Sequence, residues 1–283
     1  MQITTVYDLS KLAFIASILL IVFSIGLANP PGTIRAGLRQ PWRIGRAMLA
    51  MFVALPLFTL VVTSVLRLDT ASRVALLALS VSPMPPIMSL KARKLGGQLD
   101  YALTIHLAAV PVALLAAPVL VWLAELLFGR HATIDELAEL RVLLITMVVP
   151  LLLGIGLAHA TPRLAESMAR PARLLGSVLL VAGVAAIFWR HLPAILEVAI
   201  GPISLAIASM TVFGLWIGYS LGGPDRGNRH ALAIATASRH PGVAIAMIAT
   251  VDLAARQPIV TAIILYVIVT TILCLPYRWW AKR

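Results

Sequence analysis

The sequence predicts an all-α, polytopic transmembrane protein of about nine helices. Hydrophobic residues make up 60% of the 283 residues and charged residues only 12%, which leaves too little polar surface to cover a soluble core of this size. Apolar runs of about 20 residues, the length that crosses a bilayer as a helix, recur along the chain. Because these runs are continuous and do not alternate with polar residues, helices are expected in place of barrel strands.

Nine membrane spans are expected, joined by short polar loops. The first span follows Lys11, but Asp8 in its flank and the arginine-rich loop after it favour a span over a secretory signal. The single cysteine, Cys274, falls in the last span, so an intramolecular disulfide is excluded. The spans are expected near 8–28, 46–66, 74–96, 99–127, 142–160, 174–190, 196–221, 230–251 and 257–277.

The distribution of basic residues gives the expected orientation. Fifteen of the 23 Lys and Arg residues fall in alternate loops beginning with the loop after the first span, and seven fall in the other loops. Since cytoplasmic loops carry the excess of positive charge, the N-terminus is expected outside and the C-terminus in the cytoplasm. The arginine- and alanine-rich usage is typical of a bacterium, so a multi-pass protein of the cell (inner) membrane is expected. No aromatic-basic groove pattern accompanies the basic loops, which argues against a nucleic-acid partner.

Two of the expected spans are interrupted by proline. Pro83, Pro85 and Pro86 lie at the centre of the third span, and Pro241 and Gly242 interrupt the eighth. Proline removes a helical hydrogen bond, and unwound backbone is tolerated at membrane depth only where it is buried in protein or lines a cavity. Paired interruptions of this kind mark the central binding site of a transporter.

The interrupted span stands third in each of two sets of four spans. The first set, residues 8–127, starts outside, and the second set, residues 174–277, starts inside. Residues 142–160 form a connecting fifth span that reverses the orientation. This order predicts two inverted repeats, whose half-helix N-termini offer N–H groups and a positive dipole end to an anion.

Arg239 is the one basic residue placed inside a span. The eighth helix is expected to begin near His230, so a rise of 1.5 Å per residue carries Arg239 roughly 14 Å inward, close to the midplane. An ionisable residue at this depth is by default a functional site. The alternative is a charge that holds helices together by bonding carbonyl groups.

Other polar side chains gather around the two interruptions. His106, in the first third of the fourth span, is either a hydrogen-bonded core histidine or a proton relay, and His240 is the second candidate for proton coupling. Serine and threonine often bond their own helix backbone, but near the interruptions they are candidates for substrate binding. The candidate substrate-binding residues are Arg239, His240, Ser238, Thr236, Ser82, Ser89 and His106.

The segments at residues 26–28 with the basic loop after them, 80–88 and 235–246 together resemble the bile acid:sodium symporter family. By the order and spacing of spans the resemblance covers nearly the whole chain and is similar to nine-span members. It implies a core domain with two crossing broken helices, a separate panel domain, and alternating access to an organic-anion site.

The sodium ligands that the family implies are replaced in this chain. The family's eighth-span motif is similar to Glu-x-Gly-x-Gln-Asn-Ser-Gly, whereas residues 235–242 read Ala-Thr-Ala-Ser-Arg-His-Pro-Gly. Ala235 thus stands at the carboxylate and Arg239 at the glutamine. Sodium, like other hard cations, requires several oxygen ligands. The positions that have lost a ligand side chain are Met51, Met88, Ala102 and Ala235.

The resulting hypothesis is a secondary transporter of a small organic anion with altered or absent sodium coupling. The guanidinium of Arg239 supplies a permanent positive charge, which either pins the crossover or binds a substrate carboxylate bidentately. One alternative is a sodium symporter that uses backbone carbonyls and neighbouring hydroxyls, and another is a non-transporting membrane sensor. No HExxH, CxxC, Walker or Gly-x-Ser-x-Gly motif occurs, so neither an enzyme activity nor a metal or cofactor is expected.

Overall fold

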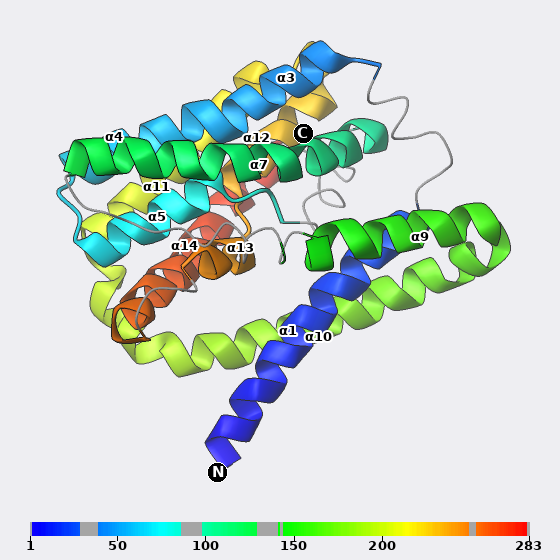
Figure 1. Cartoon of the computed structure of the whole chain (residues 1–283), viewed down its shortest axis with the longest axis horizontal. Coiled ribbons are helices and arrows are strands. Elements are labelled where there is room, and N and C mark those ends of the chain that lie inside the picture. Colours follow the sequence, from blue (N-terminus) through cyan, green and yellow to red (C-terminus); the bar gives the residue numbers. More distant parts are fainter. Residues whose placement is uncertain are drawn as a thin grey trace. The chain divides into compact units, whose positions relative to one another are not determined.

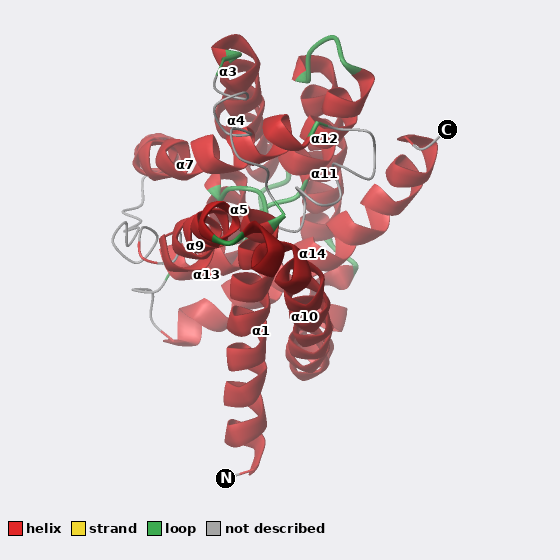
Figure 2. Cartoon of the chain, turned by 90° about the vertical axis from the view of Figure 1, so that its right-hand side faces the viewer, coloured by secondary structure: helices red, strands yellow, loops and turns green. Residues whose placement is uncertain are grey.

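The described part of the chain contains helices and connecting loops only (Figure 2). The computed structural model describes residues 2–28, 39–85, 98–128, 141, 144–248 and 253–281. The predicted all-α membrane fold is confirmed. Five helices in these residues are long and apolar enough to cross a membrane, at Pro41–Val65, Tyr101–Leu120, Pro162–Ala186, Pro202–Leu221 and Arg256–Ala281.

Helices occur in each of the nine predicted segments (Figure 1). The number of membrane crossings stays a prediction. In chain order the elements are α1 (Gln2–Leu27), α3 (Pro41–Leu49), the π-helical turn η1 (Ala50–Ala54), α4 (Leu55–Val65), α5 (Thr70–Val81), α7 (Leu99–Phe128), η2 (Leu144–Val148), α9 (Val149–Ala160), α10 (Pro162–Ala199), α11 (Pro202–Leu221), α12 (Arg226–Ala237), α13 (Pro241–Met247) and α14 (Leu253–Ala281).

The loop expected between the fifth and sixth spans is helical. Only Thr161 separates α9 from α10, which begins at Pro162 and runs for 38 residues. Proline is tolerated in the first turn of a helix because its missing N–H has no helical partner there. The alanine, leucine, methionine and glutamate that follow are strong helix formers, so the polar stretch at 163–173 extends the helix.

The chain divides into two compact units, each drawn from two parts of the sequence. Unit 1 comprises Met1–Thr33 and Arg141–Ala194, and unit 2 comprises Ile34–Leu140 and Ile195–Arg283. Both interrupted spans belong to unit 2, in line with the core and panel domains that the resemblance implies. The units cut across the predicted repeats, and the repeat boundaries stay a prediction.

Within unit 1, α1 packs along α9 through glycine (Figure 1). A Cβ atom added to Gly26 would lie 2.4 Å from the carbonyl oxygen of Leu151, and one added to Gly154 would lie 2.4 Å from that of Phe23. The two backbones are therefore in direct contact, as small residues allow between membrane helices.

Within unit 2, α11 packs against α12, α14 and α4. Gly218 brings α11 so close to α12 that an added Cβ atom would lie 2.6 Å from the Cα atom of Ala233. The Tyr266 hydroxyl of α14 donates a 2.6 Å hydrogen bond to the Ala237 carbonyl, in the last turn of α12. These contacts fix the end of α12, where the eighth span is interrupted.

Candidate functional site

The two interrupted helices begin in the same way. An aspartate caps each N-terminus: Asp69 accepts a 3.0 Å hydrogen bond from the Ser72 N–H, and Asp225 accepts a 2.9 Å bond from the Asn228 N–H. Both α5 and α12 are 12 residues long. These caps were absent from the sequence prediction, although an aspartate just before an apolar helical segment is a recognised start signal.

The two helices also end in the same way. Ser82 follows α5 with ψ 145°, and Ser238 follows α12 with ψ 121°, so each serine turns the chain into extended backbone. In both segments a proline, Pro85 or Pro241, stands three residues after the serine.

The second interruption lies just before Pro241 and Gly242, which were predicted to form it. Residues 238–240 are unwound, and Pro241 opens α13. The reason is that proline fits the first turn of a helix but disfavours helical backbone at the residue before it. At the first interruption Pro83 and Pro85 do lie in the unwound stretch. Pro86, Met88 and Ser89 lie outside the described residues.

The unwound segments bond directly to each other. The His240 N–H donates to the Pro83 carbonyl oxygen at 2.9 Å. One position earlier, Nη1 of Arg239 donates to the Ser82 carbonyl oxygen at 3.2 Å. Backbone groups that would be unpaired at membrane depth are thereby satisfied between the two unwound segments, residues 82–85 and 238–240. This meeting point of the two segments is called the crossing below.

The other terminal nitrogen of Arg239, Nη2, donates to the carbonyl oxygen of Met51. That oxygen is free because Met51 lies in η1, where the Leu55 N–H bonds the Ala50 carbonyl five residues back. The next residue, Pro56, has no N–H with which to continue this pattern. A proline inside the second predicted span was the signal for this free carbonyl.

Arg239 is 1% exposed, and its charge is met without a carboxylate. Among the residues whose side-chain exposure the structure describes, no aspartate or glutamate is buried. The guanidinium carbon lies 5.6 Å from the ring centroid of Phe52, within the range of a cation–π interaction. Two carbonyl oxygens and an aromatic ring therefore surround the cation.

The remaining predicted residues differ in what they contact. Ser82 Oγ donates to its own helix at Leu79 O, 2.9 Å away, as membrane serines often do. Ser238 and Thr236 are buried, and Thr236 Oγ1 has no hydrogen-bond partner within the described residues. Ala235 is buried too, and Ala102 packs against Ala231. These two alanines place methyl groups where the family resemblance expects oxygen ligands.

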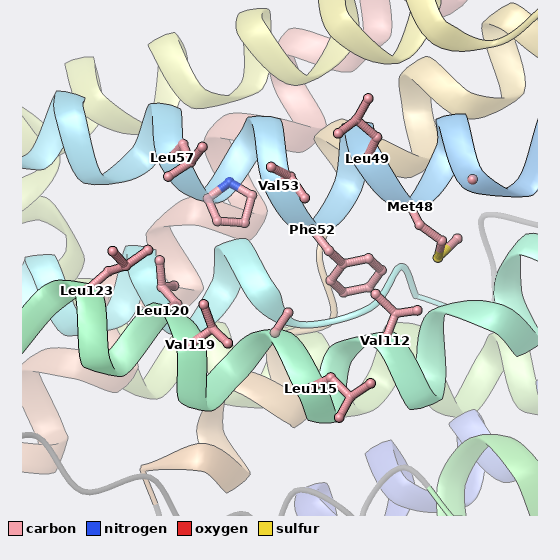
Figure 3. A pocket seen from close by; sticks show the side chains of 13 residues that line it. Met48, Leu49, Phe52, Val53, Leu57, Val112, Leu115, Val119, Leu120 and Leu123 are labelled. Carbon is pink, nitrogen blue, oxygen red and sulfur yellow. The ribbon is translucent and has the colours of Figure 1, made fainter.

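An apolar groove lies in unit 2 between the α3–α4 helix and α7 (Figure 3). Its volume is about 590 Å³, and Phe52 and Val112 face each other across it. All of its lining side chains are apolar, which suits acyl chains, and none of them can donate a hydrogen bond to an anion. The polar crossing around Arg239 is therefore the candidate site.

In unit 2 the unwound residues 82–85 after α5 and 238–240 between α12 and α13 bond to each other at buried polar groups, as is expected at the central site of a transporter built from interrupted helices. The sequence profile described as the Sodium Bile acid symporter family matches residues 15–218. The chain belongs to this family and is a membrane transporter. No curated protein sequence matches the chain. The matched range ends before α12, so the Arg239 segment lies beyond it.

Proposed function

We propose that this protein is a secondary carrier of a small organic anion that operates without sodium coupling. The observation that supports this most directly is the pair of hydrogen bonds from Arg239 to the Met51 and Ser82 carbonyls. A cation held among carbonyl oxygens at the crossing is what a sodium site provides. In this chain the cation is a side chain and cannot leave.

The chemistry of the former ligand positions supports the absence of sodium. Sodium requires several oxygen ligands, but the side chains of Met51, Ala102 and Ala235 carry none. The Met51 carbonyl, which could have served, already accepts from Arg239. A sodium ion placed there would also meet the guanidinium charge, and two like charges at a buried site repel strongly.

The similar construction of α5 and α12 supports the proposed inverted repeats, residues 8–127 and 174–277. The shared features are the aspartate cap, the 12-residue length and the serine followed by proline. Alternating access would proceed by movement of one helix group against the other. The proposed setting is the cell (inner) membrane, with the N-terminus outside and the C-terminus in the cytoplasm.

The crossing retains donors for a substrate carboxylate. Arg239 Nε and His240 Nε2 are buried, and within the described residues neither has a hydrogen-bond partner. Because the terminal nitrogens of Arg239 are already bonded, we assign the guanidinium mainly to the crossing, leaving Nε for the anion. Ser238 and Thr236 supply neutral polar contacts beside them.

Transport assays in proteoliposomes test this function. A panel of labelled anions, namely taurocholate, pyruvate and succinate, is offered in sodium medium and in choline medium. We expect at least one anion to enter at equal rates in both media. Uptake that collapses in choline identifies a sodium symporter using non-standard ligands. Binding of a panel anion without flux identifies a sensor built on the transporter fold.

A further inference from the structure

His106 is a buried titratable group that the crossing does not use. It lies on α7 and is 3% exposed, and neither of its ring nitrogens has a hydrogen-bond partner within the described residues. Leaving a buried donor or acceptor unpaired destabilises the folded protein. A buried imidazole with no partner for either nitrogen among the described residues therefore calls for an explanation beyond packing.

Contacts between α7 and α12 place His106 beside the crossing. At the first turn, the Asn228 amide accepts from the Gln98 N–H at 3.0 Å and donates to the Gln98 side chain at 3.1 Å. One turn further, Ala102 packs on Ala231. His106 lies one turn beyond Ala102 on α7, about 6 Å along the axis, on the side of the helix that Ala102 turns toward α12.

His240 of the crossing is the titratable group close enough to His106 for its charge to act on that imidazole. Nδ1 of His240 accepts a 3.3 Å hydrogen bond from the Val243 N–H. This bond holds the neutral tautomer with the proton on Nε2. A second proton on His240 would break the bond, whereas His106 can gain a proton without losing any bond.

Most of the charged groups on the elements around α7 are basic. Of the elements packed on it, α3 brings Arg43 and Arg46 close to Tyr101, and η1 carries no titratable residue. On α7 itself, Asp100 and Glu125 are roughly 9 and 28 Å from His106 along the axis. The remaining charged or titratable groups are Arg73 of α5 with its cap Asp69, Arg226, Arg229 and His230 of α12 with its cap Asp225, and Arg239 and His240 of the crossing.

We propose that His106 binds a proton that travels with the anion, which makes the carrier a proton–anion symporter. This inference rests on the proposed anion transport. In the empty carrier, the positive charge of Arg239 opposes a second positive charge on His106. An anion at the crossing offsets that repulsion, so anion and proton each increase the affinity for the other.

The test is accumulation driven by a pH gradient in sodium-free proteoliposomes. With the outside one pH unit more acidic, one proton per monoanion supports up to about tenfold accumulation of pyruvate or taurocholate, since one pH unit equals 1.36 kcal/mol. A pH dye inside the vesicles reports proton entry with the anion. Anion flux that ignores the gradient and brings no protons overturns the proposal but leaves the proposed function standing. No flux of any panel anion removes both.

Substitution of single histidines tests whether His106 is the residue that binds the proton. His106→Gln is expected to abolish gradient-driven accumulation, whereas His159→Gln, an exposed histidine in unit 1, retains it. Accumulation that survives in folded His106→Gln protein contradicts the assignment. Size-exclusion chromatography and thermal unfolding establish that the variant is folded. If it is not, the wild-type gradient measurement still decides between coupling and its absence.

Discussion

Helices α5 and α12 both start at an aspartate cap, run for 12 residues and end at a serine, yet their unwound segments carry different groups. Pro83 and Arg239 hold equivalent places, one residue after the serine. Proline has no N–H and no polar side chain, so the first segment presents carbonyl oxygens. The second presents a guanidinium and the His240 N–H, and its donors pair with those carbonyls.

Under the proposed function, this difference explains how the two unwound segments stay together without a mobile ion. Carbonyl oxygens that converge at membrane depth need positive charge or donors. A bound cation can meet that need and can also leave, which lets it drive transport. A guanidinium on one of the segments meets it permanently. The fold that the family shares is therefore compatible with a different energy source.

Removing the guanidinium takes away the donors that pair with the carbonyl oxygens at the crossing, and it should cause the largest loss of stability. In Arg239→Gln the shorter neutral side chain leaves the Ser82 and Met51 carbonyls without their donors, at about 1–3 kcal/mol for each unpaired group. Arg239→Lys keeps the charge but not the two-pronged geometry, so its loss should be intermediate. Thermal unfolding in detergent measures both.

Arg170 provides the matched control, because it is exposed on α10. Arg170→Gln should change the free energy of unfolding by less than about 0.5 kcal/mol. An Arg239→Gln protein as stable as this control would mean that the two carbonyls are satisfied without the guanidinium.

The sequence was sufficient for the fold class and for locating unwound backbone at residues 83–85 and directly before Pro241. Apolar runs report burial in lipid directly, and Pro83, Pro85 and Pro241 report lost helical hydrogen bonds. The same pattern misplaced the second interruption, since Pro241 stops the helix before it and starts the next one. It also ended the fifth span in a loop where a single residue, Thr161, joins two helices.

The partners of Arg239 were beyond sequence reasoning for a physical reason. They are carbonyl oxygens, which every residue has, and only η1 and Pro56 make the Met51 oxygen free. The Phe52 ring and the Tyr266 hydroxyl likewise reach the crossing through tertiary packing. The positions of Ala102 and Ala235 were expected from the family resemblance, while their burial came from the structure.

Removing the aspartate caps of α5 and α12 tests whether the two helices are equivalent, with a smaller expected loss of stability than at Arg239. Asp69→Ala and Asp225→Ala should each cost about 1 kcal/mol, while the Asn variants keep an acceptor and should cost little. Unequal losses, with one cap neutral, would break the equivalence of α5 and α12.

Burial raises the pKa of Asp69, but hydrogen bonds from Ser72 and the backbone outweigh it and leave the pKa below its ordinary value. This contribution should therefore be present above the unfolded-state pKa, about 3.9, and vanish as the pH falls through the lowered folded-state value.

The central claim is that Arg239 occupies the place of the coupling ion, and the melting temperature of purified wild-type protein in sodium chloride against choline chloride tests it most directly. A sodium site filled at ten times its dissociation constant stabilises the folded protein by about 1.4 kcal/mol, which raises the melting temperature by several degrees. We predict the same melting temperature in both salts at every concentration up to that used for transport. A sodium-dependent rise that saturates would show a functioning sodium site and contradict the account.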